Sequence, residues 1–342
     1  MRLRDYIIRR LLLAIPVLFG VSILTFTISH VVGDPAAAWI TDRTREDVRQ
    51  RVIEQHGLDK PLPIQYLIYM RDLAKGDLGV SPTEGGRPVL DCMRDYLPTT
   101  IELSLTAFIL LMIIGIPLGI ISAIKKDRWP DHLSRFFALS GVSIPVFWFA
   151  LLLQFVFFYE LVIRNLPHLP LEGRYQILLG PPPRVTGFFM LDSILALNSE
   201  KFFDSLFHLI LPAVTLAFGG AGAITRIMRG SMLEVIRQDY IRTARSKGLS
   251  ERTVIYKHAL RNAMIPTTTL SGLVFAGLLG GAPLTETVFN LPGLGRYAVR
   301  TMLATDFGGI MGVVLFFAIT IVAANLLVDI LYSMLDPRIR LG

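Results

Sequence analysis

The sequence of Arg226–Asn262, RIMRGSMLEVIRQDYIRTARSKGLSERTVIYKHALRN, is a polar stretch between two long apolar segments. It contains nine Lys and Arg residues against three acidic residues. Good helix formers fill Ser231–Lys247, and Gly248 supplies the left-handed residue that commonly follows a helix end. Ser250 suits an N-cap, and Glu251 suits the first turn of a following helix. The stretch therefore predicts a helix, a tight turn and a second helix that continues to about its end.

The rest of the chain has the composition of a membrane protein. Its 342 residues are 52% hydrophobic and 18% charged, with a mean hydropathy of +0.54, whereas ordinary soluble domains are about 25% charged. A membrane-spanning helix needs about 20 mostly apolar residues. Cys92 is the single cysteine, which excludes a disulfide framework within the chain. Six segments are long and apolar enough to span: Leu11–Val32, Thr99–Ile124, Leu133–Val162, Leu206–Thr225, Ala263–Leu284 and Gly308–Met334.

Basic residues beside the apolar segments predict the topology, because cytoplasmic loops carry an excess of Lys and Arg. Four arginines precede the first apolar segment (Arg2, Arg4, Arg9 and Arg10) and place the N-terminus in the cytoplasm, with the first span retained. Six alternating spans then place the C-terminus and Arg226–Asn262 in the cytoplasm. More than half of the 34 Lys and Arg residues fall in the predicted cytoplasmic pieces.

The predicted fold class is an all-α integral membrane protein with six transmembrane helices. We divide the chain into residues 1–98, the first span with an extracytoplasmic segment at 33–98, and residues 99–342, a five-helix core. This core contains the cytoplasmic loop 226–262 and an extracytoplasmic loop at 160–205. Segment 33–98 is expected to contain short helices at Thr44–Gln55 and Pro61–Ala74 and to cap the outer mouth. The proline-rich segment 160–205 is expected to be an irregular loop.

The sequence lacks the motifs of the common enzyme classes. It has no G-x-x-x-x-G-K-[ST] phosphate loop, no H-E-x-x-H metal motif and no complete nucleophile elbow. We therefore expect no catalysis, no bound cofactor and no metal site in this chain. Ionisable residues within the apolar segments are few (Glu102, Glu286 and Asp329), and we expect all three near span ends that water reaches. The lack of mid-span acids argues against a proton- or sodium-driven carrier.

The stretch Asp239–Gly248, D-Y-I-R-T-A-R-S-K-G, followed by Ile265 and Pro266, resembles the cytoplasmic loop signature of binding-protein-dependent ABC importer permeases. Arg242 and Thr243 replace the glutamate and first alanine of that signature, as in its dipeptide/oligopeptide/nickel branch. Further segments resemble that branch in order along the chain: Tyr6–Ser22, Gly33–Pro35, Gly57–Tyr66, Gly76–Gly79, Leu291–Arg296 and the ending L-D-P-R-I-R.

The resemblance implies a type I ABC importer permease fold in the inner or plasma membrane of a prokaryote. It implies pairing with a second, usually non-identical permease, two cytoplasmic ATPases that hold ATP and Mg, and an extracytoplasmic solute-binding protein. The helix–turn–helix would be the coupling element that docks on an ATPase; from the residues alone, a basic loop lying on anionic lipid headgroups is an equal alternative. The implied coupling residues are Tyr240, Arg242, Thr243, Ala244, Arg245, Lys247, Gly248, Leu249, Val254, Ile255 and Pro266.

Five glycines within the spans are candidates for a gate: Gly219, Gly220, Gly222, Gly277 and Gly281. Small-residue pairs at four-residue spacing also predict close helix packing, namely Gly115/Gly119, Gly277/Gly281 and Gly308/Gly312. Di- and oligopeptides are the expected solutes, with nickel, glutathione and oligosaccharides as alternatives within the branch. Outside the family, the alternatives are a secondary transporter, which would need a coupling-ion site, and a membrane enzyme.

Overall fold

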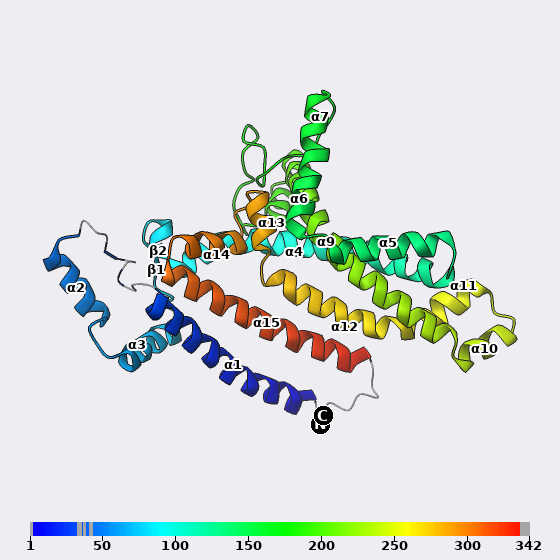
Figure 1. Ribbon diagram of the computed structural model, residues 1–342, viewed down its shortest axis with the longest axis horizontal. Helices are drawn as coiled ribbons and strands as arrows, with labels where there is room; N and C mark the ends of the chain where they lie inside the picture. The colour runs from blue at the N-terminus through cyan, green and yellow to red at the C-terminus, as the bar shows by residue number, and fades with distance from the viewer. Residues whose placement is uncertain (1–2, 33–35, 37–38, 41–43, 336–342) are drawn as a thin grey trace.

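The computed structural model of the protein describes residues 3–32, 36, 39–40 and 44–335. In this part of the chain the regular elements are helices, apart from one antiparallel hairpin of β1 (Val80–Ser81) and β2 (Arg87–Pro88). The long helices lie side by side along one axis and form an elongated bundle (Figure 1). The predicted all-α class is therefore confirmed.

Within the described residues, six helical stretches are long and apolar enough to cross a membrane. All the predicted spans except the third correspond to one helix each. The fifth differs at its outer end, because its helix stops at Leu279, before Gly281 with its φ of +92°. The helices that contain the spans other than the third are α1 (Leu3–Val32), α4 (Val89–Ile124), α9 (Ser199–Ile236), α12 (Leu260–Leu279) and α15 (Phe307–Leu335).

The third predicted span, Leu133–Val162, is wrong as a single helix. It covers most of α5 (Trp129–Ser143), all of α6 (Val146–Gln154) and of a π-helical turn (Phe155–Tyr159), and most of α7 (Glu160–Ile163). Ile144, with an extended ψ of 126°, separates α5 from α6. Because Ile144 precedes Pro145, steric clash with the proline ring disfavours a helical conformation there. The membrane-length stretch is therefore Val146–Ile163, and α6 and α7 rise away from the bundle axis (Figure 1).

The contact between α4 and α9 lies at the centre of the bundle. Glycines on α4 allow the two helices to approach each other closely. A Cβ atom on Gly115 would lie 2.9 Å from the Cβ of Ile224, and one on Gly119 would lie 2.6 Å from the Cβ of Met228. The close packing predicted for this pair is confirmed. The same holds for Gly312, where an added Cβ would lie 2.5 Å from Val89 Cγ1.

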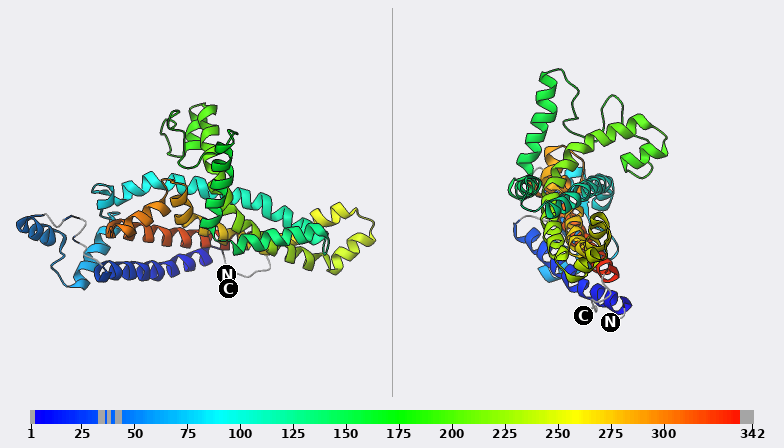
Figure 2. Two further views of the ribbon diagram at one scale, coloured as in Figure 1. Left: turned by 45° about the horizontal axis from the view of Figure 1, so that its top comes forward. Right: turned by 90° about the vertical axis from the view of Figure 1, so that its right-hand side faces the viewer.

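The first outer segment contains the two predicted short helices, observed as α2 (Glu46–His56) and α3 (Leu62–Ala74). Contacts between α3 and α1 include Tyr66 Oη with Ser22 Oγ at 2.7 Å. The helix α4 begins at Val89, ten residues before the predicted Thr99, so the expected boundary at residue 98 lies inside a helix. The segment and the Arg226–Asn262 loop lie at opposite ends of the bundle (Figure 2).

The second outer segment is more ordered than the irregular loop predicted for residues 160–205. It contains α7, α8 (Phe189–Leu195) and the first turns of α9. Asp192 accepts hydrogen bonds from the backbone N–H groups of Thr186 and Gly187 at 2.8 and 2.9 Å, which fixes the turn before α8. Local side-chain bonds of this kind satisfy backbone N–H groups that lie outside a helix or sheet.

Two short helices, α13 (Pro283–Val288) and α14 (Leu294–Leu303), connect α12 to α15. The buried carboxylate of Glu286 accepts hydrogen bonds from Thr100 Oγ1 at 2.9 Å and from the backbone N–H of Arg296 at 2.8 Å. The second bond lies at the N-terminus of α14, where unpaired N–H groups favour an anion. A Cβ atom at Gly295 would lie 3.0 Å from this carboxylate, so the Leu291–Arg296 motif needs glycine here.

Candidate functional site

The Arg226–Asn262 stretch forms a hairpin at one end of the bundle, with boundaries that differ from the prediction. The expected single helix Ser231–Lys247 is interrupted: α9 ends at Ile236, Gln238 is extended with ψ 152°, and a separate helix begins. The second expected helix does not end at Asn262 but continues into the membrane-length helix α12. The elements of the hairpin are α10 (Asp239–Ser246), α11 (Glu251–Thr253), a π-helical turn (Val254–Ala259) and the start of α12.

The turn of the hairpin has the predicted chemistry. Gly248 has a φ of +73°, a conformation that costs side-chain-bearing residues about 1–2 kcal/mol. An added Cβ at this glycine would have no heavy atom within 4 Å, so the backbone conformation and not space requires glycine. Ser250 is the N-cap of α11, and its Oγ accepts from the backbone N–H of Thr253 at 3.4 Å.

One face of the hairpin is buried within the chain itself. Ile241 and Ala244 of α10 belong to the same apolar cluster as Val254, Ile255 and the α9 residue Met232. Val254 is 0% exposed and Ile255 is 5% exposed. These two implied coupling residues therefore pack inside the chain and are not exposed for docking on a partner. Because the chain is interrupted before α10, this helix folds back on α9. Ile241 and Ala244, three positions apart on one face of α10, then cover α9.

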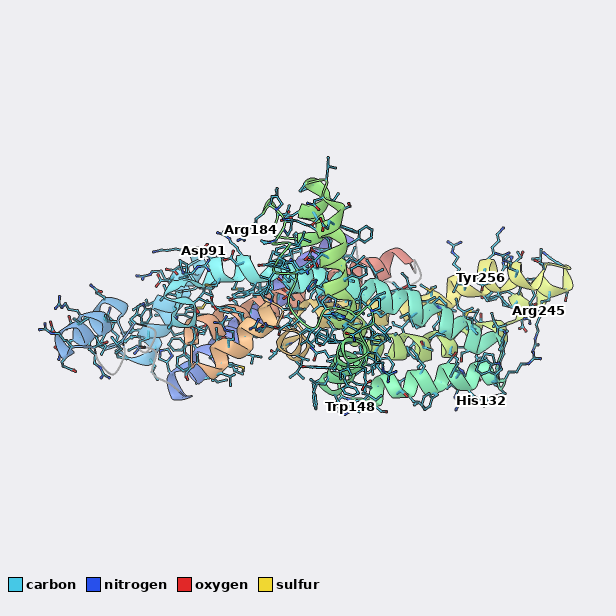
Figure 3. The ribbon with its side chains drawn as sticks, turned by 90° about the horizontal axis from the view of Figure 1, so that it is seen from above. Asp91, His132, Trp148, Arg184, Arg245 and Tyr256 are labelled. Carbon is cyan, nitrogen blue, oxygen red and sulfur yellow. The ribbon has the colours of Figure 1, made fainter. Side chains whose placement is uncertain are left out.

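The opposite face of the hairpin is exposed, basic and partly apolar. Tyr240 and Leu249 are 38% and 40% exposed, and Tyr256, which sequence analysis did not identify, is 53% exposed. Arg245 and Tyr256 point outward at the same end of the molecule (Figure 3). Basic residues outnumber acidic ones on this part of the surface: the exposed acids are Asp239 and Glu251, and the exposed basic residues and threonine are Arg242, Thr243, Arg245, Lys247, Arg252, Lys257 and Arg261.

Two polar contacts fix the two arms of the hairpin relative to each other. Arg245 forms a bidentate pair with Glu251, at 2.6 and 3.1 Å, across the turn. Tyr240 Oη accepts from Asn262 Nδ2 at 2.7 Å, which joins α10 to the start of α12. Exposed ion pairs contribute less than about 1 kcal/mol each, so these contacts orient the exposed face more than they stabilise the fold. Pro266 lies one turn further on, within α12, and does not end that helix.

An ion pair with a buried carboxylate lies at the base of the hairpin. No motif in the sequence predicts that its two residues meet. Asp131, in the first turn of α5, pairs with Arg229 of α9, 98 positions away in sequence. The guanidinium of Arg229, together with Ser122 and the backbone N–H of Asp127, holds the pKa of the Asp131 carboxyl well below its usual range, against the opposing effect of burial.

The five candidate gate glycines do not form one site. Gly219 and Gly222 lie where α9 crosses α5: added Cβ atoms would approach the backbone oxygens of Gly141 and Ala138 at 3.2 and 2.7 Å. Gly220 faces Leu111 of α4. In contrast, Gly277 would meet nothing within 4 Å, and Gly281 follows the end of α12. The role of all five in a gate remains a prediction.

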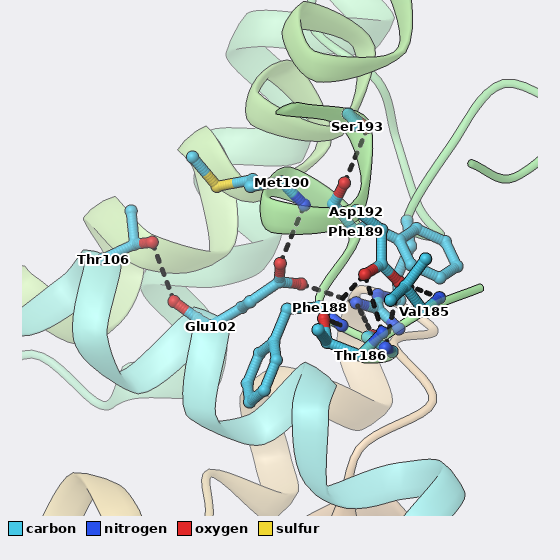
Figure 4. Close-up of polar contacts among 11 residues, drawn as sticks. Glu102, Thr106, Val185, Thr186, Phe188, Phe189, Met190, Asp192 and Ser193 are labelled. Atoms are coloured by element: carbon cyan, nitrogen blue, oxygen red, sulfur yellow. Dashed lines mark hydrogen bonds and ion pairs between the residues drawn. The ribbon is translucent and has the colours of Figure 1, made fainter. Parts of the chain in front are cut away.

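The acidic residues singled out within the apolar segments are buried rather than reached by water. Glu102 is 8% exposed and Glu286 is 0% exposed, so the expected access of water to these two is wrong. Glu286 does lie beyond the end of the fifth span, in α13, and the side chain of Asp329 lies outside the described residues. Glu102 pairs with Arg174 of the outer loop at 2.5 Å. It also accepts from the backbone N–H of Met190 at 2.9 Å (Figure 4). Low-dielectric surroundings make such charges costly unless they are paired.

Comparison with known proteins identifies the family and the fold. Residues 115–341 match the family described as "Binding-protein-dependent transport system inner membrane component", and residues 3–106 match "Binding-prot-dependent transport system membrane comp, N-term". A permease structure titled inward facing conformations of the MetNI methionine ABC transporter has a TM-score of 0.51 and 16% identity, covering 73% of this chain and 99% of that chain. The predicted type I ABC importer permease fold is confirmed.

Full-length relatives are closer in sequence. The probable D,D-dipeptide transport system permease protein DdpB of Escherichia coli (strain K12) is 46% identical over 95% of this chain and 94% of that protein. The dipeptide transport system permease protein DppB of Alkalihalophilus pseudofirmus is 44% identical over 98% and 99%. The glutathione transport system permease protein GsiC of Escherichia coli O6:H1 is 39% identical over 98% and 99%. This multi-pass membrane chain therefore belongs to the family of inner membrane components of binding-protein-dependent transport systems.

Proposed function

We propose that this chain is the transmembrane permease subunit of an ATP-driven importer of di- and oligopeptides. It forms half of the translocation pore, with a second homologous but non-identical permease as the other half. An extracytoplasmic binding protein delivers the solute to the outer mouth, which residues 33–98 cap. Two cytoplasmic ATPase subunits bind ATP and Mg and carry out hydrolysis, and this chain itself catalyses no reaction. The names of the full-length relatives support peptides as the solute class.

The observation that carries the proposal is the two-faced hairpin. Its inner face is fixed to α9 by a buried apolar cluster, so a force on the hairpin reaches the helix it packs against. Its outer face leaves Tyr240, Leu249 and Tyr256 exposed among cations. An apolar group rimmed by polar residues favours a protein partner over water, and the basic rim favours an acidic groove on that partner.

The orientation of the spans follows from the same hairpin. It lies at the opposite end of the bundle from α2 and α3 (Figure 2), so the two polar ends occupy different sides of a membrane. The helices α1 and α15 run antiparallel, and the start of α1 and the end of α15 are both directed away from α3 (Figure 1). The excess of basic residues in the hairpin supports a cytoplasmic location for this side of the membrane, in line with the predicted cytoplasmic termini.

In the proposed cycle, ATP binding closes the two ATPases and moves their docked hairpins toward each other. The helices continuous with the hairpin, α9 and α12, then rotate and open the pore outward to accept solute. Hydrolysis and product release reverse the movement. The cycle requires contacts that differ between the two states, because a partner that binds both states equally shifts no population.

A charge placed on the exposed hairpin tests docking directly. Leu249, 40% exposed, is replaced by glutamate in the reconstituted transporter, and the affinity for the purified ATPase subunits is measured. Loss of a packed contact at an interface centre weakens binding about tenfold or more. Leu178→Glu, at a residue 93% exposed in the outer loop, is the matched control and leaves that affinity unchanged. Equal affinities for the two variants, or ATP-independent uptake by the chain alone, would refute the proposal.

Glutathione is the second candidate solute, because the GsiC relative is named for its transport and is 39% identical. Both candidates carry peptide bonds and a free amino group, so the binding protein that works with this chain decides between them. Uptake of a labelled dipeptide into proteoliposomes, with unlabelled peptides, glutathione and nickel as competitors, separates the solutes. Inhibition by unlabelled peptides alone is the expected outcome.

A further inference from the structure

The buried Asp131 ion pair joins two helices just inside the hairpin. Arg229 Nε and one terminal nitrogen both donate to the carboxylate of Asp131 at 2.8 Å. The side chain of Asp131 is 0% exposed and that of Arg229 is 21% exposed. Paired N–H···O bonds of this kind fix orientation as well as distance, because the guanidinium and the carboxylate are both planar.

Two more donors complete the coordination of the same carboxylate. Ser122 Oγ, in the last turn of α4, donates to Asp131 Oδ1 at 2.5 Å. The backbone N–H of Asp127, in the turn between α4 and α5, donates to the other oxygen at 3.0 Å. One carboxylate therefore connects α4, the α4–α5 turn, α5 and α9. A partly satisfied buried network would be costly, whereas both oxygens of this one have two donors each.

The ion pair is continuous with the apolar core of the hairpin. Arg229 follows Met228, and Ser122 precedes Ala123; Met228 and Ala123 both belong to the cluster that buries Ile241 and Val254. The close approach of Gly119 to Met228 holds α4 against α9 one turn away. The hairpin and the inner ends of α4, α5 and α9 thus form one closely packed block.

From this arrangement, and resting on the proposed coupling function, we propose that Asp131 and Arg229 are positioning residues for transport. They make the inner ends of α4 and α5 follow the hairpin, so that a movement imposed on the hairpin reaches these helices as well as α9 and α12. The pair is suited to this because the Asp131 carboxylate is buried: separation of the pair leaves that charge unpaired in a low-dielectric environment. The exposed Arg245–Glu251 pair has no such penalty.

The test compares solute transported per ATP hydrolysed in the complete transporter reconstituted in proteoliposomes. Asp131→Asn removes the charge with little change of shape. We expect ATP hydrolysis to persist and the transport ratio to fall about fivefold or more, the low end of a typical coupling free energy between sites. Arg229→Lys keeps the charge but loses the paired donors, and we expect a smaller fall. Ser122→Ala leaves the ion pair in place, and we expect the smallest fall in the transport ratio for this variant.

Asp91→Asn is the matched control, because Asp91 makes an exposed ion pair at the other end of α4, with a side chain 49% exposed. It should leave the ratio at the wild-type value. A purely structural role predicts a different result: less assembled transporter and a lower Tm, with an unchanged ratio in the molecules that assemble. An unchanged ratio in Asp131→Asn and Arg229→Lys would overturn the inference.

If Asp131→Asn does not assemble, the graded pair Arg229→Lys and Ser122→Ala gives the answer. A ratio that falls in the order of lost donors supports the inference, and wild-type ratios in both refute it. The wild-type transporter separates this outcome from failure of the proposed function. If wild-type uptake does not depend on ATP and the ATPase subunits, the proposed function fails. If wild-type uptake does depend on them and the variants keep the wild-type transport ratio, only the positioning role fails.

Discussion

The conformation of Gly248 gives the sharpest test of the hairpin. At its φ of +73°, a residue with a β-branched side chain costs at least about 1–2 kcal/mol, whereas asparagine occupies this region readily. A Cβ atom at this position would have no neighbouring heavy atom within 4 Å. The cost of a substitution therefore reports the backbone conformation and not a steric clash. At about 1.4 kcal/mol per factor of ten, Gly248→Val should populate the observed turn roughly tenfold less.

The assay is the affinity of the ATPase subunits for the permease in lipid nanodiscs. If docking uses the observed turn, Gly248→Val binds about tenfold more weakly, since the competent conformation is populated less, and Gly248→Asn stays near wild type. The Tm of Gly248→Asn should match wild type, and any fall in the Tm of Gly248→Val should be limited to the backbone penalty, because the added side chain meets no neighbour. Equal affinities for the valine and asparagine variants would show that docking does not depend on this turn.

Three further predictions concern stability. Arg174→Met leaves Glu102 buried without its ion-pair partner and should destabilise the fold by about 3–5 kcal/mol, seen as a lower Tm. Gly119→Ala brings a Cβ to 2.6 Å from Met228 and should cost about 1–3 kcal/mol, whereas Gly230→Ala, with no atom within 4 Å, should not destabilise. The lowered pKa of Asp131 means that its contribution is present above the unfolded pKa of about 3.9 and is lost as pH falls toward its folded pKa.

Each stability prediction has a result that would contradict it. The double variant with Glu102→Gln and Arg174→Met should recover part of the lost stability, because no charge is left unpaired; no recovery would assign the loss to packing. Equal Tm values for the two alanine variants would contradict the close approach of α4 and α9. Acid unfolding curves of wild type and Asp131→Asn should converge below about pH 4, and parallel curves would show that this carboxyl does not titrate as described.

The sequence alone determined the features that depend on local pattern. Apolar length located five of the six spans, because a bilayer-crossing helix needs about 20 apolar residues wherever it packs. Gly248 and Ser250 marked the turn of the hairpin, because a left-handed residue and an N-cap are local requirements. The ordered motifs of the loop and of Leu291–Arg296 indicated the family, which the comparisons confirm.

Only the tertiary structure decided which side chains are buried and which are brought together. Val254 and Ile255 have the apolar character of docking residues, but α10 folds back and covers them. Gly115 and Gly277 both belong to pairs of glycines four residues apart, yet of these two only Gly115 meets a neighbouring helix. The spacing of glycines does not determine which helix packs against them. Asp131 and Arg229 pair across 98 positions of sequence, and burial then gives that contact its strength. Such pairings depend on how helices cross, a non-local property that no local pattern encodes.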